Sequence, residues 1–242
     1  MSRLSFSFNN DIYNELIDEI RWSYERFDDF IIAADIMAKN EHKNINNKID
    51  EWNEKYPNHE ISGFETQEDD YIRFLSFANH IDFAIMILAY STFEINLKKI
   101  CCVISNDNLS KLVPDDFAGK GILQSKIFLE KVLLFDFNSI KDEWEIIILY
   151  QYMRNKIVHS NGRIDVKATS KLSDLNEVKR IEQLALGTIS EDGQIKLFKE
   201  DIRKFTKTAT DVMVTILETL AEKKVIQKHS PTSAEMRTLA QK

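Results

Sequence analysis

The chain has 242 residues, of which 43% are hydrophobic and 29% are charged, and its formal net charge is −7. This balance is ordinary for a globular protein that buries a sizeable core. The negative charge argues against a protein that coats nucleic acid, because such proteins bind by neutralising phosphates. The richest apolar stretch, residues 81–90, is interrupted by Asp82, so no run reaches the length of a membrane span. The N-terminus lacks the apolar core of a signal peptide, and we expect a cytoplasmic protein without membrane contact.

Turn residues and cysteines are scarce. Six glycines and three prolines leave several long segments without either residue, which favours helices over a turn-rich β fold. The adjacent Cys101 and Cys102 would point about 100° apart on a helix, so they predict neither a disulfide nor a metal site. We expect buried free thiols. No phosphate loop or HExxH pair occurs, and we predict no cofactor and no metal.

The first part of the chain reads as helix with an extended start. Leu4, Phe6 and Phe8 alternate with polar residues, which predicts a short strand or an extended arm before Asn9-Asn10 caps a helix. That helix carries an apolar stripe with three- and four-residue spacing, formed by Tyr13, Leu16, Ile20, Tyr24, Phe27, Ile31 and Ala34. After a polar patch, the same spacing in residues 45–56 predicts a second helix or a continuation to about residue 55. Pro57 then ends it, and residues 58–66 read as a loop.

The remaining elements follow from periodicity and turn residues. Residues 67–105 form the longest predicted helix, which is apolar on nearly every face around residues 83–88 and therefore central to a bundle. A loop over 107–121 precedes helices over about 122–135 and 139–160. Residues 162–179 are polar and irregular, and residues 184–189 and 194–198 flank a Ser-Glu-Asp-Gly turn that predicts a β-hairpin. Glu200 and Asp201 open a last helix, and the chain from Lys223 reads as a mobile tail.

The helix around residues 142–162 has two faces. One face is predicted to pack in the core, and it consists of Ile146, Leu149, Tyr150, Met153 and Ile157. Asn155 and His159 lie on the opposite side with Ile148 and Tyr152 beside them. An isoleucine and a tyrosine are poor choices for a solvated face, so we expect the second face to meet another surface.

Arg154 and His159 are the candidate functional pair of this helix. Ideal geometry places them about 140° apart, so they can flank a bound group. Ser160-Asn161-Gly162 supplies the left-handed residue that closes a helix, so His159 lies in the last turn, where the helix dipole favours a protonated imidazole. Spacing alone proves little, because short motifs recur by chance. Arg73 and His80, six residues between them, lie in the middle of an apolar helix, and we interpret that pair as structural.

The setting of Arg154 and His159 is more specific than their spacing. Residues 154–162, RNKIVHSNG, place a polar residue after the arginine, two apolar residues before the histidine and a turn directly after it. This pattern resembles the HEPN superfamily, whose motif lies near the end of the third main helix of an all-helical bundle. Residues 90–100, YSTFEINLKKI, look like the family's preceding helix. The resemblance covers about residues 67–223, but it is specific at nine residues and only architectural elsewhere.

The resemblance and the periodicity together predict an all-α, multi-helix bundle of HEPN type. Residues 1–63 would form an N-terminal helical extension packed on the bundle, residues 64–225 the HEPN-like domain, and residues 226–242 a flexible tail. A small β-hairpin would precede the last helix. Active members of the family are metal-independent endoribonucleases that work as dimers, and many belong to toxin–antitoxin or anti-phage systems.

The two residues suit RNA cleavage without metal. An imidazole such as His159 can move a proton near neutral pH, and the guanidinium of Arg154 can hold phosphate oxygens through two hydrogen bonds. Asn155 either supports this site by hydrogen bonding to the ring or a phosphate, or is a polar residue on a solvated face. Basic residues around the motif form either a local RNA surface or a solvated charged loop, and they are Lys156, Arg163, Lys167 and Lys171.

Partners follow from the second face and from the resemblance. A two-fold homodimer through Ile148 and Tyr152 would bury this pair and bring two Arg154–His159 sets into one cleft. The predicted partners are an RNA substrate, a second copy of the chain and an antitoxin or regulatory protein. The alternative function is a non-catalytic helical module, either a degenerate HEPN domain used for dimerisation and ligand or partner binding, or an unrelated bundle with a chance motif.

Overall fold

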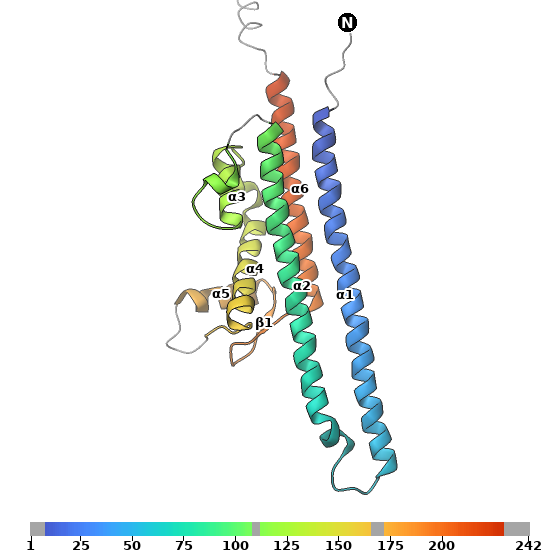
Figure 1. Ribbon diagram of the computed structural model, residues 1–242. Helices are drawn as coiled ribbons and strands as arrows, with labels where there is room; N and C mark the ends of the chain where they lie inside the picture. The colour runs from blue at the N-terminus through green and yellow to red at the C-terminus, as the bar shows by residue number, and fades with distance from the viewer. Residues whose placement is uncertain (1–7, 108–111, 166–171, 230–242) are drawn as a thin grey trace, which may run out of the picture. The chain divides into compact units, whose positions relative to one another are not determined.

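Helices dominate the computed structural model, which describes residues 8–107, 112–165 and 172–229. They are α1 (Phe8–Lys55), α2 (Gly63–Asp107), α3 (Ile122–Lys131), α4 (Lys141–Ser160), α5 (Leu172–Gln183) and α6 (Lys199–His229) (Figure 1). Two 3-10 segments, Pro114–Asp116 and Phe137–Ile140, and two short strands, β1 (Thr188–Ile189) and β2 (Ile195–Lys196), complete the regular structure of the described residues. The predicted all-α class is confirmed.

α1 is one continuous helix, so the second of the two expected arrangements is correct. The polar patch over residues 39–44 contains neither glycine nor proline, and the buried stripe resumes beyond it at Ile45, which is 1% exposed. The helix ends at Lys55, just before Pro57, as predicted. Phe8, expected in an extended arm, begins the helix, and the rest of that arm, residues 1–7, lies outside the described part of the chain.

α2 begins at Gly63, four residues earlier than periodicity indicated. Its first turn is held by a capping box, in which the Ser62 backbone N–H donates to Glu65 Oε2 over 2.7 Å and the Glu65 backbone N–H donates to Ser62 Oγ over 3.3 Å. Gly63 is required there because a Cβ atom would lie 2.4 Å from the carbonyl oxygen of Ile49. The α1–α2 turn is therefore a close packing of two helices as well as a connection.

The described residues form two compact units, and each unit draws on distant parts of the sequence. The first combines described residues of 1–22, 93–144 and 208–242, and the second combines 23–92 with the described residues of 145–207. The division into an N-terminal extension over residues 1–63, a domain over 64–225 and a tail over 226–242 stays a prediction. α1 supplies buried residues to both units, Ile20 to the first and Ile31 to the second, because its apolar stripe runs along its whole length.

An aromatic cluster joins three helices in the core of the second unit. The Phe205 ring of α6 lies 5.9 Å from that of Tyr90 on α2 and 4.9 Å from that of Tyr150 on α4. The Tyr150 hydroxyl donates to the carbonyl oxygen of Asp201 over 2.6 Å, and burial raises the pKa of Tyr150 well above its ordinary value. The cluster fixes α4 against α2 and α6 at the middle of the motif helix.

The first unit contains its own aromatic core and both cysteines. Trp144 lies 4.7 Å from the Phe137 ring and 6.4 Å from the Phe93 ring. Both thiols are free, but only Cys101 is fully buried, and burial raises its pKa to about 12. Within the described residues, no three His, Cys, Asp or Glu side chains gather as a metal-binding group.

The predicted β-hairpin is present in the second unit. Thr188 pairs with Lys196 and Ile189 with Ile195 in an antiparallel register, and Gly193 closes the turn with a φ of 83°. The strands have two residues each, shorter than the predicted segments. Ile195 is fully buried, so the hairpin serves as a small cover on the helical core.

The predicted apolar stripe of α6 is buried throughout, and it comprises Ile202, Phe205, Ala209, Val212, Ile216 and Leu220. The helix continues to His229, past the Lys223 position at which it was expected to end. Residues 226–229 of the predicted tail are therefore helical. The remainder of that tail, residues 230–242, lies outside the described residues.

α2 is long and apolar enough, by length and composition alone, to cross a membrane. An 18-residue window within it has a mean hydropathy of 1.4, although only 22% of that window is buried. We predicted no membrane span because no uninterrupted apolar run is long enough. A window that includes up to two charged residues is long and apolar enough. Core helices of soluble proteins pass the same test, so the informative observation is that much of this apolar helix is exposed.

Candidate functional site

The core face of α4 positions the motif. Tyr150 and Met153 are fully buried and Ile157 is nearly so, as predicted. One position of this face was wrong, because Ile147 is buried while Ile146 is only half-buried. The candidate residues at positions 154, 155 and 159 nevertheless stay on the predicted sides of the helix.

The predicted closure of α4 is confirmed. Asn161 and Gly162 have φ values of 49° and 76°, and the Gly162 N–H donates to the Lys156 carbonyl oxygen over 3.0 Å, a Schellman-type bond. A Cβ atom on Gly162 would lie 2.7 Å from the Phe83 ring. The Ile195 N–H donates to the Gly162 carbonyl oxygen over 2.8 Å. The end of α4, and with it His159, is thus anchored to α2 and to the β-hairpin.

Arg154 lies against α2. Its guanidinium carbon is 5.9 Å from the centre of the Tyr90 ring, and its Nη1 donates to Asn155 Oδ1 over 3.1 Å. Its Nε is buried and has no hydrogen-bond partner among the described residues. The side chain as a whole is half-buried. A buried guanidinium N–H without a partner is costly, so the Arg154 Nε is an unsatisfied donor.

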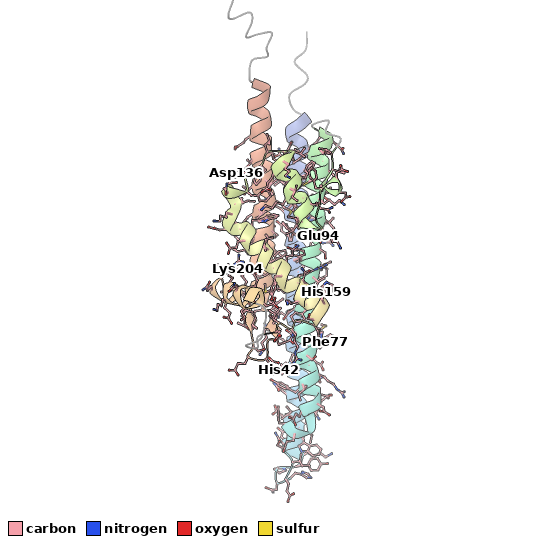
Figure 2. The ribbon with its side chains drawn as sticks, turned by 90° about the vertical axis from the view of Figure 1, so that its left-hand side faces the viewer. His42, Phe77, Glu94, Asp136, His159 and Lys204 are labelled. Carbon is pink, nitrogen blue, oxygen red and sulfur yellow. The ribbon has the colours of Figure 1, made fainter. Side chains whose placement is uncertain are left out.

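His159 lies on the exposed last turn of α4, where Figure 2 labels it. Its ring makes no hydrogen bond or ion pair with the described residues. Asn155 is also exposed and bonds to Arg154, not to the histidine. Within one chain, therefore, Asn155 and Arg154 are brought together, whereas Arg154 and His159 remain on different sides of the helix, as the ideal geometry predicted.

The second face of α4 is partly covered by the same chain. The Tyr152 hydroxyl donates to Asp174 Oδ1 of α5 over 2.9 Å, and Lys156 Nζ lies 3.2 Å from Asp174 Oδ2. Burial and this bond raise the pKa of Tyr152 well above its ordinary value. Tyr152, which we expected a second copy of the chain to bury, is thus already half-buried by α5 of the same chain. Ile148 is also half-buried.

α5 is the element that sequence reasoning missed, because residues 162–179 were predicted to be irregular. Arg180 fastens it to α4 through Glu145, with Nε donating to Glu145 Oε1 over 3.1 Å, and also pairs with Glu177. Its apolar signal was short but present, in the three-residue spacing of Leu175, Val178 and Ile181. Ile181 is fully buried. That spacing would have identified α5 and placed Asp174 in its first turn, directly before Leu175.

The two described members of the basic group around the motif both form ion pairs. Lys156 forms its ion pair with Asp174, and Arg163 Nη2 lies 3.6 Å from Asp192 Oδ2. The other two candidates, Lys167 and Lys171, lie outside the described residues. Of the two readings of this group, the described members favour a charged surface with internal ion pairs over an open phosphate-binding patch.

Asp82 is a titratable residue that the sequence marked only as an interruption of an apolar stretch. Burial raises its pKa to about 6, and Lys199, which lowers it, only partly opposes this effect. Lys199 itself is bonded to Asp35 of α1. Asp82 thus changes charge near neutral pH inside the second unit, at the level where α2 faces the start of α6.

Comparison of the sequence and the structure with known proteins found no relative. No family model matches the sequence, and no curated protein or solved structure matches it either. The resemblance to the HEPN superfamily therefore rests on the residues of the motif and on the helix that carries them.

Proposed function

We propose that the chain is a metal-independent endoribonuclease of HEPN type and an effector of a toxin or anti-phage system, in which Arg154 holds the scissile phosphate and His159 transfers protons. The observation that carries the proposal is the contrast between the two side chains at one helix end. Arg154 is held in place with an unpartnered buried Nε, while His159 is exposed on the adjacent turn. A fixed phosphate ligand beside an accessible proton carrier suits phosphoryl chemistry.

The proposed reaction is an internal displacement. The ribose 2′-oxygen gives up its proton and forms a bond to the adjacent phosphorus, and the bond from phosphorus to the 5′-oxygen breaks. The departing 5′-oxygen takes up a proton. Imidazole can serve as donor or acceptor in these transfers, and the guanidinium stabilises the charge that gathers on the phosphate oxygens.

A second copy of the chain belongs to this proposal, because one chain keeps Arg154 and His159 on different sides of α4. The predicted interface included Ile148 and Tyr152, but α5 covers part of this face at Tyr152. A second copy can therefore contact only the part of the face that α5 leaves open. That flank carries Ile148, Asn155 and His159. A two-fold contact there could set Arg154 of one copy near His159 of the other.

One observation favours a second candidate, a non-catalytic helical module that uses the same fold for dimerisation or partner binding. Arg154 packs on Tyr90 and bonds to Asn155, contacts that a purely structural arginine would also make. The two candidates differ in one respect, which is whether the intact protein breaks RNA.

The test is incubation of the full chain with RNA in EDTA, followed by analysis of the product ends. The proposal predicts cleavage with 2′,3′-cyclic phosphate and 5′-hydroxyl ends, and no cleavage of the matching DNA, which lacks the nucleophile. Loss of cleavage on chelation, products with 3′-hydroxyl ends, or equal cleavage of DNA would contradict it. Absence of any cleavage, with the helical circular dichroism intact, would favour the non-catalytic module.

A further inference from the structure

The α1–α2 hairpin of the second unit exposes large apolar side chains on the face opposite to the one that binds α6. We call this the groove face, and it consists of Phe30, Ala33 and Met37 of α1 and Phe77, Ile81, Ala84 and Leu88 of α2. Phe30 is 53% exposed, Met37 46%, Phe77 55% and Leu88 49%. Surface apolar residues are common singly, but a contiguous set marks an interaction site.

The orientation of this face follows from the residues that bind α6. Asp28 and Asp35 of α1 pair with Arg203 and Lys199 of α6. On an ideal helix Phe30 and Met37 lie about 160° around from these acids. The groove face therefore points away from α6, and Figure 1 shows the α1–α2 hairpin continuing past the start of α6 and the end of α4.

The face is grooved, with its apolar residues in a helix-packing pattern. A groove of about 580 Å³ lies between the helices, lined by Met37, Phe74, Phe77 and Ile81 among others. Phe77, Ile81, Ala84 and Leu88 follow alternating four- and three-residue steps, as do seams of helical bundles. Small residues at Ala33 and Ala84 allow another helix to approach closely.

We propose that a second copy of this chain docks on the groove face, so that two α1–α2 hairpins form a four-helix contact. The second unit contains thirty residues of α2, Gly63–Thr92, which are about 45 Å long, and two adjacent helices are about 20 Å wide. The hairpin thus offers about 900 Å², and a stable interface needs about 800 Å² from each partner.

The charges beside the groove fit a copy of the same surface. Arg73 and Glu41 both line the groove, and a two-fold dimer pairs a surface with itself, so a surface with both signs can match its own charges. A lipid surface is a poorer fit. The groove also contains Asp70, and the chain carries a net charge of −7, which anionic headgroups repel.

The deciding experiment compares two glutamate variants of α2 by light scattering at about 50 μM. Phe77, labelled in Figure 2, lies on the groove face, and Leu75 lies about 160° around the helix from it with similar exposure, 55% against 51%. Phe77→Glu is expected to halve the particle mass of the wild type, whereas Leu75→Glu leaves it unchanged. Circular dichroism checks folding. If Phe77→Glu fails to fold, Met37→Glu with Ile36→Glu as its control provides the same comparison on α1.

A monomeric wild type would overturn the proposal, as would equal masses for wild type and Phe77→Glu, or an equal loss in both members of a pair. Binding of monomeric wild type to neutral phosphatidylcholine vesicles, lost in Phe77→Glu, would instead identify the face as a lipid site. Because the readout is mass, the result does not depend on whether the protein cleaves RNA. An assembly that also used the Ile148 flank would contain four chains or more, and Phe77→Glu would reduce it to the dimer joined through that flank.

Discussion

The second face of α4 and the groove face of the α1–α2 hairpin both carry apolar side chains outside the main core. Another element of the chain covers part of the α4 face, whereas the groove face stays exposed. On α4 the chain supplies its own cover, because α5 binds Tyr152 through Asp174 and fastens to Glu145 through Arg180. On the hairpin, Phe77 remains more than half exposed. A two-faced helix therefore predicts that a cover exists, but not whether the cover comes from the same chain or another.

A large effect is expected at Arg154, the proposed phosphate ligand on α4. Arg154→Lys should lower RNA cleavage by about 100-fold, because a single ammonium cannot replace the planar pair of donors, and losing one such donor costs a catalytic site about this much. Single-turnover cleavage in EDTA measures the change. Unaltered cleavage would show that the position needs only positive charge. Loss of helical circular dichroism would make Arg154 a structural residue.

Ile148→Glu tests whether the uncovered flank of α4 is an interface in its own right. A carboxylate there opposes burial against another copy, so we expect cleavage to fall at least tenfold and the particle mass to halve. Val158→Glu is the control for mass, since Val158 is 45% exposed on another side of α4. Normal mass and normal cleavage in Ile148→Glu would restrict self-association to the groove face.

Removing the bond that holds α5 on α4 should have a smaller effect. Tyr152→Phe deletes the hydroxyl that donates to Asp174, and the loss should be about 1 kcal/mol of unfolding free energy. Urea unfolding monitored by circular dichroism gives the value. The ion pair from Lys156 to Asp174 remains, so α5 should stay in place. An unchanged midpoint would mean that the bond contributes nothing to the cover.

The sequence predicted the geometry of α4 better than its surroundings, and the reason is physical. Helical periodicity and the Ser160-Asn161-Gly162 closure are local, so the position of His159 and its separation from Arg154 could be read directly. The cover on Tyr152 depends on α5, whose apolar stripe has only three residues and whose contact is an ion-paired Asp174 from a distant segment. Local patterns do not contain such contacts.

The extent of the hairpin shows the same limit. The polar patch in α1 suggested a break, but without glycine or proline the helix had no reason to end, and Ile45 continues its buried stripe. The apolar α2 was predicted to be central to a bundle, and the structure confirms burial on one side of it, at Phe83, Met86 and Tyr90. Which of its faces would stay exposed could not be predicted, because that depends on where α4 and α6 begin and end.

A further prediction concerns the pH dependence of the second unit. Burial raises the folded-state pKa of Asp82 to about 6 from an ordinary value of 3.8, so between these values the folded state binds more protons than the unfolded state. Stability should fall as pH rises from about 4 to 6, and Asp82→Asn should flatten that part of the profile and stabilise the protein at pH 7. Unfolding midpoints across this range provide the check. A variant that is less stable at pH 7 would show that the ionised carboxylate is favourable beside Lys199.

The most direct test of the proposed site is a comparison of two exposed histidines in the same RNA cleavage assay with EDTA. His159 lies at the end of α4, and His80 lies on α2 with its Nδ1 2.6 Å from the Ser76 carbonyl oxygen. His159→Ala should lower the cleavage rate by about 100-fold or more, the range expected for a lost general acid or base, while His80→Ala stays close to wild type. Cleavage that persists unchanged in His159→Ala would contradict the account.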